Sequence, residues 1–324
     1  MKNVKIFVLA AVLFTACGFS VFAQAAPRSY YVRADGDDEN NNGRSEEAPL
    51  KTLLKAIEMA SKGAVKTITV LGVLELDDIR ISVTGSHEIL ITGKANASDE
   101  EKAVLTGTAQ YLFSVWDGSD IKIRLENIDV SGRGESAFRA RGGNVIIGPG
   151  AKISGFYDGG VKVHGGIVTL AGGEISNNEG GGVVVVSGTF IMESGSITKN
   201  SASQGGGVWI FDGTTTTISG GTIQNNTAKE GGGIYDGGGI TTISNGTISA
   251  NNAEYGAGLY INNGQYANRN ATLTITGGRI TGNIAEFVGG GVYVASKSVF
   301  NQRGGTISGN EAGDGEGENI FRQQ

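Results

Sequence analysis

Four basic side chains fall at alternating positions in two short apolar segments near the middle of the chain. Arg139 and Arg141 lie in the first segment, and Lys162 and His164 lie in the second. Alternate residues of a β-strand point to the same face, so strands at these segments would turn all four side chains outward. Such a cluster suits a polyanionic glycan, and a Lys or Arg could act as the base that removes a proton beside a uronate carboxylate. The alternative is a basic face that is only solvated.

The same chemistry would use carboxylates to hold Ca²⁺, which neutralises the uronate. Asp117, Asp158 and Asp212 recur at a similar phase of the sequence, but they do not form a compact set of three. The acidic loop at residues 35–39 lacks the Glu at the twelfth position of a calcium loop, so it is predicted to be an Asx-rich turn. The two histidines are far apart and predict no metal centre. We therefore expect no metal and no other cofactor, except Ca²⁺ if the protein is an enzyme.

A phrase repeated in the second half of the chain predicts how such residues are positioned. Gly-x-Ile-x-x-Asn occurs six times, and successive isoleucines are 22, 26, 25, 32 and 27 residues apart. A unit this short cannot bury its apolar side alone, so it must stack on copies of itself. We expect the stacked asparagines to form a structural ladder, with amides that hydrogen-bond from coil to coil. The ladder residues are Asn178, Asn200, Asn226, Asn251, Asn283 and Asn310.

Each repeat carries three short strand-like segments separated by glycine-rich turns. Three strands per coil predict an all-β fold, a right-handed parallel β-helix of three sheets, because parallel crossovers are usually right-handed. An amphipathic helix from Pro49 to Gly63 is expected to cover the N-terminal end. Its buried face would hold Leu50, Leu53, Leu54 and Ile57. The predicted divisions are an export signal at 1–25, a cap segment at 26–63, irregular coils at 64–149 and regular coils at 150–324.

One aromatic residue per coil takes the outward position in the strands that follow the glycine clusters. These residues are Trp209, Tyr235, Tyr260 and Tyr293. The basic residues are expected one coil earlier in the same column. Aromatic rings can stack on sugars or anchor a protein partner, and they can equally cover one another along the column. Both interpretations stay open, and the predicted ligand-binding residues are the four aromatics together with Arg139 and Arg141.

The first 25 residues have the features of an export signal. Lys2 and Lys5 precede an apolar run, and Ala23-Gln24-Ala25 fits a cleavage site. The alternative is a lipoprotein anchored to a membrane through Cys17, the only cysteine. Signal cleavage takes the net charge from −6 to −8, and an acidic chain argues against a nucleic-acid partner. We expect an exported protein that is periplasmic, on the cell surface or secreted, with a membrane partner only if it is lipidated.

The N-terminal segment and the repeats both resemble known bacterial proteins. Tyr31-Val32, Gly36-Asp37-Asp38, Asn42-Gly43, Pro49-Leu50-Lys51-Thr52 and Ala56-Ile57 resemble the opening of right-handed parallel β-helix proteins, some of them polysaccharide lyases with a pectate lyase-like fold. The Gly-Gly-Gly-Val/Ile strands and Ile-x-x-Asn phrases are similar to repeats of chlamydial polymorphic outer-membrane proteins, with Ile in place of Phe. The resemblance implies secretion and surface exposure, with adhesion or glycan processing as common uses.

Two functional hypotheses follow. The first is an exported β-helix repeat protein that presents a surface for adhesion or interaction, with a glycan or a host or cell-surface protein as partner and no catalysis. The alternative is a carbohydrate-active enzyme, a polysaccharide lyase acting on an acidic glycan, in which Arg139, Lys162 and His164 would be the catalytic candidates.

Overall fold

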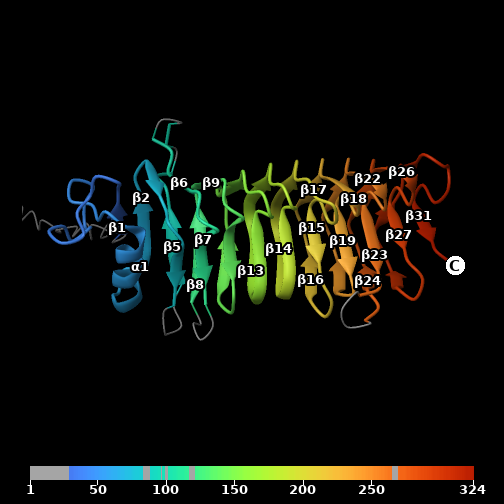
Figure 1. Ribbon diagram of the computed structural model, residues 1–324, viewed down its shortest axis with the longest axis horizontal. Helices are drawn as coiled ribbons and strands as arrows, with labels where there is room; N and C mark the ends of the chain where they lie inside the picture. Colours follow the sequence, from blue (N-terminus) through green and yellow to red (C-terminus); the bar gives the residue numbers. More distant parts are fainter. Residues whose placement is uncertain (1–28, 83–87, 96, 99–100, 117–120, 265–268) are drawn as a thin grey trace, which may run out of the picture.

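The computed structural model describes residues 29–82, 88–95, 97–98, 101–116, 121–264 and 269–324. Within these residues the protein is an all-β parallel β-solenoid with one helix, α1 (Leu53–Lys62), and its coils follow one another along the long axis (Figure 1). This confirms the predicted fold class. The right-handed sense stays a prediction. The export signal, Cys17 and Asp117 lie outside the described residues.

All pairings between the named strands are parallel, and most fall into three columns along the solenoid. Two long strands, β13 (Val161–Ser176) and β14 (Val183–Thr198), pass through all three columns. Because they join the columns, the strands of the three columns form one connected sheet of 27 strands. The pairings thus give three columns within one connected sheet, and the predicted number of three sheets stays a prediction.

The first column begins each coil, and β13 and β14 pass through it together with the shorter strands that follow. It contains β1 (Ser29–Val32), β2 (Thr67–Val70), β5 (Glu88–Thr92), β8 (Lys122–Glu126), β11 (Asn144–Ile147), β16 (Thr215–Ile218), β20 (Ile240–Ile243), β24 (Thr272–Ile275) and β28 (Val299–Gln302). The second column follows it in each coil. It contains β3 (Val73–Glu75), β6 (Val104–Gly107), β9 (Asp129–Gly132), β12 (Lys152–Ser154), β17 (Thr222–Gln224), β21 (Thr247–Ser249), β25 (Arg279–Thr281) and β29 (Thr306–Ile307).

The third column closes the coil and carries the predicted site residues. It contains β4 (Ile79–Ile81), β7 (Tyr111–Val115), β10 (Ser136–Ala140), β15 (Val208–Ile210), β19 (Ile234–Gly237), β23 (Leu259–Asn262), β27 (Val292–Val294) and β31 (Ile320–Arg322). Between the second and third columns of the later coils lies a separate four-stranded sheet. Its strands are β18 (Thr227–Glu230), β22 (Asn252–Tyr255), β26 (Ile284–Val288) and β30 (Glu311–Ala312).

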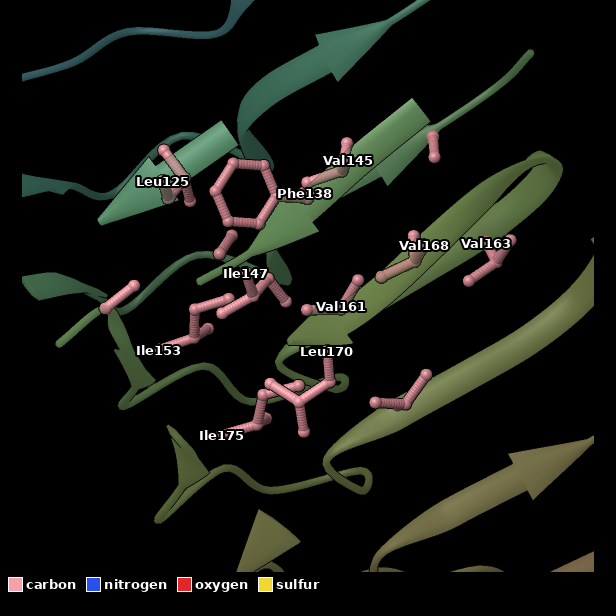
Figure 2. Close-up of a cluster of buried hydrophobic side chains, with 14 of the residues drawn as sticks. Leu125, Phe138, Val145, Ile147, Ile153, Val161, Val163, Val168, Leu170 and Ile175 are labelled. Atoms are coloured by element: carbon pink, nitrogen blue, oxygen red, sulfur yellow. The ribbon is translucent and has the colours of Figure 1, made fainter. Parts of the chain in front are cut away.

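The core lies inside the coils, where apolar residues at alternate strand positions meet from all three columns. Figure 2 shows Phe138 from the third column, Val145 from the first and Ile153 from the second pointing into the same interior. The isoleucine of the repeated phrase stays buried from coil to coil, for example Ile175 and Ile223. Alternation in a strand and repetition along the chain thus produce one continuous core.

The six asparagines of the repeated phrase lie at the inner corner after the second column and form a hydrogen-bonded ladder. Asn178 Nδ2 donates to Asn200 Oδ1 at 3.0 Å, and Asn200 Nδ2 donates to Asn226 Oδ1 at 3.0 Å. The same pattern continues through Asn251 and Asn283 to Asn310. The residue before each asparagine has a positive φ, which turns the chain at this corner, as at Asn225 with φ 55°.

α1 lies at one end of the solenoid (Figure 1) and differs from its prediction in two details. It begins at Leu53 with Thr52 as N-cap, so Pro49 lies before the helix. The reason is Asp38, whose carboxylate accepts hydrogen bonds from the backbone N–H groups of Lys51 and Thr52 and sets the start. Leu54 is 41% exposed rather than buried. Gly63 ends the helix as predicted.

Candidate functional site

The outward residues of the third column form one continuous row across the solenoid, which we call the outer row. Strand register aligns Arg139 with Lys162, and it aligns Trp209 with Tyr235 and then with the later tyrosines. Val184 pairs with both Lys162 and Trp209, so one apolar coil separates the basic and aromatic parts. The basic residues were expected on the coil directly before the aromatics. This expectation is wrong, because Lys162 lies two coils before Trp209. Parallel strands about 4.8 Å apart bring residues distant in sequence into direct contact along this row.

Lys162 is held by two carboxylates on the basic part of the outer row. Its Nζ forms an ion pair with Asp158 Oδ2 and lies 3.9 Å from Glu135 Oε2. Glu135 in turn accepts a hydrogen bond from the Tyr111 hydroxyl at 3.1 Å and from Gln110 Nε2 at 2.8 Å. The side chain of Lys162 is only 12% exposed. Its charge is therefore largely matched by neighbouring side chains of the protein.

Arg139 and Arg141 are arranged differently, because each guanidinium lies over an aromatic ring. Arg139 Cζ is 4.8 Å from the ring centre of Tyr111, and Arg141 Cζ is 4.5 Å from that of Trp116. These cation–π contacts fix the two cations against the surface. Arg139 Nε is buried and has no hydrogen-bond acceptor among the described residues. Neither arginine forms an ion pair within the described part of the chain.

His164 completes the basic cluster, which we define as Arg139, Arg141, Lys162 and His164. Burial, followed by the charges of Arg139, Lys162 and Arg141, lowers the pKa of His164 from 6.5 to about 4. The imidazole is therefore uncharged at neutral pH, and the cluster carries three permanent cations. A base with so low a pKa holds a proton weakly.

The tyrosines of the outer row point away from the core but are covered. Tyr235 and Tyr260 stack with their centroids 5.4 Å apart, and Tyr260 and Tyr293 stack at 4.4 Å. Tyr255 and Val288, from the separate four-stranded sheet, pack against the same rings. Burial raises the pKa of Tyr235, and the three tyrosines are at most 8% exposed. This geometry agrees with the alternative in which the rings cover one another.

Trp209 is more open and lines a hollow with Phe211, Gln204 and Asp212 at the edge of the stacked tyrosines. The hollow has a volume of about 20 Å³, which corresponds to roughly one water molecule. Asp212 lies here, two coils beyond Lys162, so the structure does not bring it to the basic cluster. Of the three predicted aspartates, only Asp158 reaches the cluster among the described residues.

Three residues of this site were not recognised in the sequence. Glu135, Tyr111 and Trp116 hold or support the basic side chains. Glu135 precedes its strand by one residue, so strand alternation gave no reason to place it beside Lys162. Tyr111 and Trp116 lie at the two ends of the segment Tyr111–Trp116, and the pairing of β7 with β10 places this segment beside the strand that carries Arg139. The ring contacts with the arginines depend on that pairing, which the sequence alone does not give.

Calcium would suit a lyase, but the residues present do not fit it. No group of three or more His, Cys, Asp or Glu side chains that could hold a metal ion occurs in the described residues. Glu135 and Asp158 are already engaged by Lys162. In the same residues, no helix has the length and apolar content required to cross a lipid bilayer.

No protein-family model matches this chain, and no significant match is found among curated proteins or solved structures.

Proposed function

We propose that the protein is an exported β-solenoid that presents a surface for adhesion or interaction and binds an acidic glycan at the basic cluster. Export is supported by the signal-like residues 1–25, and kinship with bacterial β-helix repeat proteins is supported by the sequence resemblance. The glycan is favoured over an acidic host or cell-surface protein because the basic residues lie on neighbouring strands of one column, with Arg139 aligned with Lys162. Basic side chains on successive coils suit the repeated carboxylates of a linear polymer.

The observation that carries this proposal is the placement of Arg139, whose guanidinium lies over the Tyr111 ring without an ion-pair partner among the described residues. A buried polar group without a partner costs about 1–3 kcal/mol, and more when the group is charged. Arg139 Nε is in this position while the guanidinium is fixed over Tyr111. A ligand carboxylate that meets the outer part of this guanidinium would form a charge-assisted hydrogen bond with it. The site is therefore arranged before the ligand arrives, which reduces the ordering cost of binding.

The distribution of charge around the basic cluster also favours an acidic ligand. Glu135 and Asp158 offset Lys162, whereas Arg139 and Arg141 have no described ion-pair partner. The cluster thus keeps a local positive charge on a chain whose net charge is −6. A local field of this sign attracts a polyanion and repels cations. The attraction should weaken as salt concentration rises.

The lyase alternative is favoured by one observation. Arg139 and Lys162 are register partners on adjacent coils, and His164 lies two residues from Lys162 on the same face. A lyase requires a side chain that removes a proton near neutral pH. Lys162 is engaged in ion pairs with two carboxylates, and the pKa of His164 is lowered to about 4. Binding without chemistry is therefore the better-supported function.

The test uses the purified protein with immobilised polygalacturonate, and with a neutral galactan as the control polymer. Arg139→Ala should weaken binding to polygalacturonate about tenfold or more, equivalent to ~1.4 kcal/mol. The matched control is Arg279→Ala, which removes an exposed arginine of the second column and should bind normally. Absence of binding to polygalacturonate and to other uronate polymers, or an equal loss in the control, would reject the proposal.

The same polymers separate binding from catalysis. Each is incubated with the protein with and without Ca²⁺, while the absorbance of the unsaturated product is followed. We expect no product. Turnover that disappears in Lys162→Ala or Arg139→Ala would establish the lyase alternative instead.

A further inference from the structure

The corner between the first and second columns is built on a repeated pair of residues, and one coil departs from the pattern. The second member of the pair is the glycine that opens each Gly-x-Ile-x-x-Asn phrase. The first member is glycine in four copies, serine in one and asparagine in the remaining one. The six pairs are Gly172-Gly173, Ser194-Gly195, Gly220-Gly221, Asn245-Gly246, Gly277-Gly278 and Gly304-Gly305. Among these pairs, Asn245 alone carries an amide.

An asparagine that precedes a glycine can react with its own backbone. The backbone nitrogen of the glycine attacks the side-chain Cγ, and the absence of a Cβ on that residue leaves the approach open. The chain contains three such pairs: Asn42-Gly43, Asn245-Gly246 and Asn263-Gly264. The attack requires an amide and a backbone N–H that are not held in hydrogen bonds, so the structure can distinguish the three.

The first and third pairs are held by hydrogen bonds. The Gly43 N–H donates to a backbone carbonyl at 3.2 Å, and the Gly264 N–H donates to another at 2.7 Å. The side chains are engaged as well. Asn42 Oδ1 accepts from the Arg44 N–H at 2.9 Å, and Asn263 Nδ2 donates to a backbone carbonyl at 2.7 Å. Attack in either pair would first have to break these bonds.

Asn245 and Gly246 meet both requirements. Among the described residues, no hydrogen bond involves the Asn245 amide or the Gly246 N–H. Asn245 is exposed at the corner, so water reaches its side chain. Gly246 has φ 97°, a conformation that favours glycine and fixes the residue type at this position. The corner thus combines the reactive sequence with unengaged reacting groups.

We propose that Asn245-Gly246 is a site of spontaneous deamidation. The Gly246 nitrogen forms a bond to Asn245 Cγ and loses its proton, while the bond from Cγ to Nδ2 breaks and ammonia leaves. Water then opens the cyclic succinimide at either carbonyl, which gives aspartate or isoaspartate. The step is a transfer of an acyl group and requires neither an oxidant nor a reductant. It is independent of glycan binding, which uses the third column.

The isoaspartate product should disturb the stacking of coils. Isoaspartate adds a carbon to the main chain, at a corner where neighbouring coils are in close contact. A Cβ at Gly278, on the next coil, would lie only 2.8 Å from Gly246 O, and a Cβ at Gly246 would lie 3.0 Å from Gly221 O. A longer main chain at this corner must therefore displace an adjacent coil. Because each coil of a solenoid stabilises its neighbours, the whole molecule should lose stability.

The test follows the three asparagines over time in the purified full-length protein, kept in mildly alkaline buffer. Peptide mapping by mass spectrometry detects the replacement of an amide by a hydroxyl, and chromatography separates aspartate from isoaspartate. A second sample is kept in urea, which removes the hydrogen bonds of the folded state. Asn245→Ser is the matched control, because Ser194 occupies the equivalent position of another coil. Urea unfolding of aged samples measures their stability.

In the folded protein, we expect Asn245 to convert roughly tenfold or more faster than Asn42 and Asn263, whose hydrogen bonds must first be broken. In urea the three should convert at comparable rates. The aged protein should unfold at a lower urea concentration than fresh protein, whereas aged Asn245→Ser should not change. An Asn245 that stays unmodified, or that converts no faster than the other two in the folded protein, would overturn the proposal. An equal loss of stability in aged Asn245→Ser would overturn the effect on stacking.

Discussion

Replacement of Asn226 by alanine tests the asparagine ladder most directly. The side chain is fully buried and takes part in four hydrogen bonds through its amide. Its Nδ2 donates to Ile197 O and to Asn251 Oδ1, both at 3.0 Å. Its Oδ1 accepts from the backbone N–H and the Nδ2 of Asn200, both at 3.0 Å. The residue therefore links the coil before it to the coil after it.

Alanine at this position leaves identified groups without partners. The backbone N–H of Asn200 and one of its Nδ2 hydrogens lose their acceptor, and Ile197 O loses this donor. Each buried unsatisfied group costs about 1–3 kcal/mol. Counting the two donors alone, Asn226→Ala should lower the free energy of unfolding by about 2–6 kcal/mol. Water cannot easily take over, because the ladder is closed on both sides by neighbouring coils.

The assay is urea unfolding followed by far-UV circular dichroism. Thr227→Ala is the control, because this neighbouring side chain is exposed and should change stability by less than about 0.5 kcal/mol. Since coils of a solenoid stabilise their neighbours, a broadened transition is also expected when one interface is weakened. If Asn226→Ala and Thr227→Ala unfold at the same urea concentration, the ladder contributes nothing measurable and the reasoning is refuted.

Three further predictions concern single groups. Burial raises the pKa of Asp236 from 3.8 to about 6, so the folded protein binds this proton more tightly and stability should fall as pH rises across that interval. Asp236→Asn should abolish this slope and add about 3 kcal/mol at pH 8, measured by urea unfolding. Ala250 has φ 51°, so Ala250→Asn should stabilise the fold by about 0.5–1 kcal/mol in the same assay. Because the pKa of His164 is about 4, polygalacturonate binding at constant ionic strength should be unchanged between about pH 8 and pH 6, whereas an ordinary histidine would strengthen it there.

The stacking of coils was predictable from sequence because each coil must carry the same residue at the same corner.

The asparagine ladder also has a member that the repeated phrase did not contain. Asn310 donates through Nδ2 to Asn319 Oδ1 at 3.1 Å. Asn319 aligns with Gly291, where a Cβ would lie 2.9 Å from Asn310 Nδ2. At Gly291 the absence of a side chain leaves room for the amide of Asn310, whereas at the next register position the amide of Asn319 itself joins the ladder. No spacing rule predicts that exchange, because Asn319 lies outside the repeated phrase.

The outer row shows why the direction of a side chain could be predicted but its exposure could not. Strand alternation correctly predicted that Tyr260 and Arg139 point out of the core. This direction depends only on the neighbouring residues of the same strand. Exposure depends on the adjacent coils and on other sheets. Tyr260 is covered by equal rings at 4.4 and 5.4 Å and by strands inserted beside it. The register partner of Arg139 on the preceding coil is Ser114, whose side chain is too short to cover a guanidinium. The guanidinium of Arg139 contacts the ring of Tyr111 on one side only. The same outward position is thus structural where successive coils carry like side chains, and we propose that it binds a ligand where they differ in size and charge.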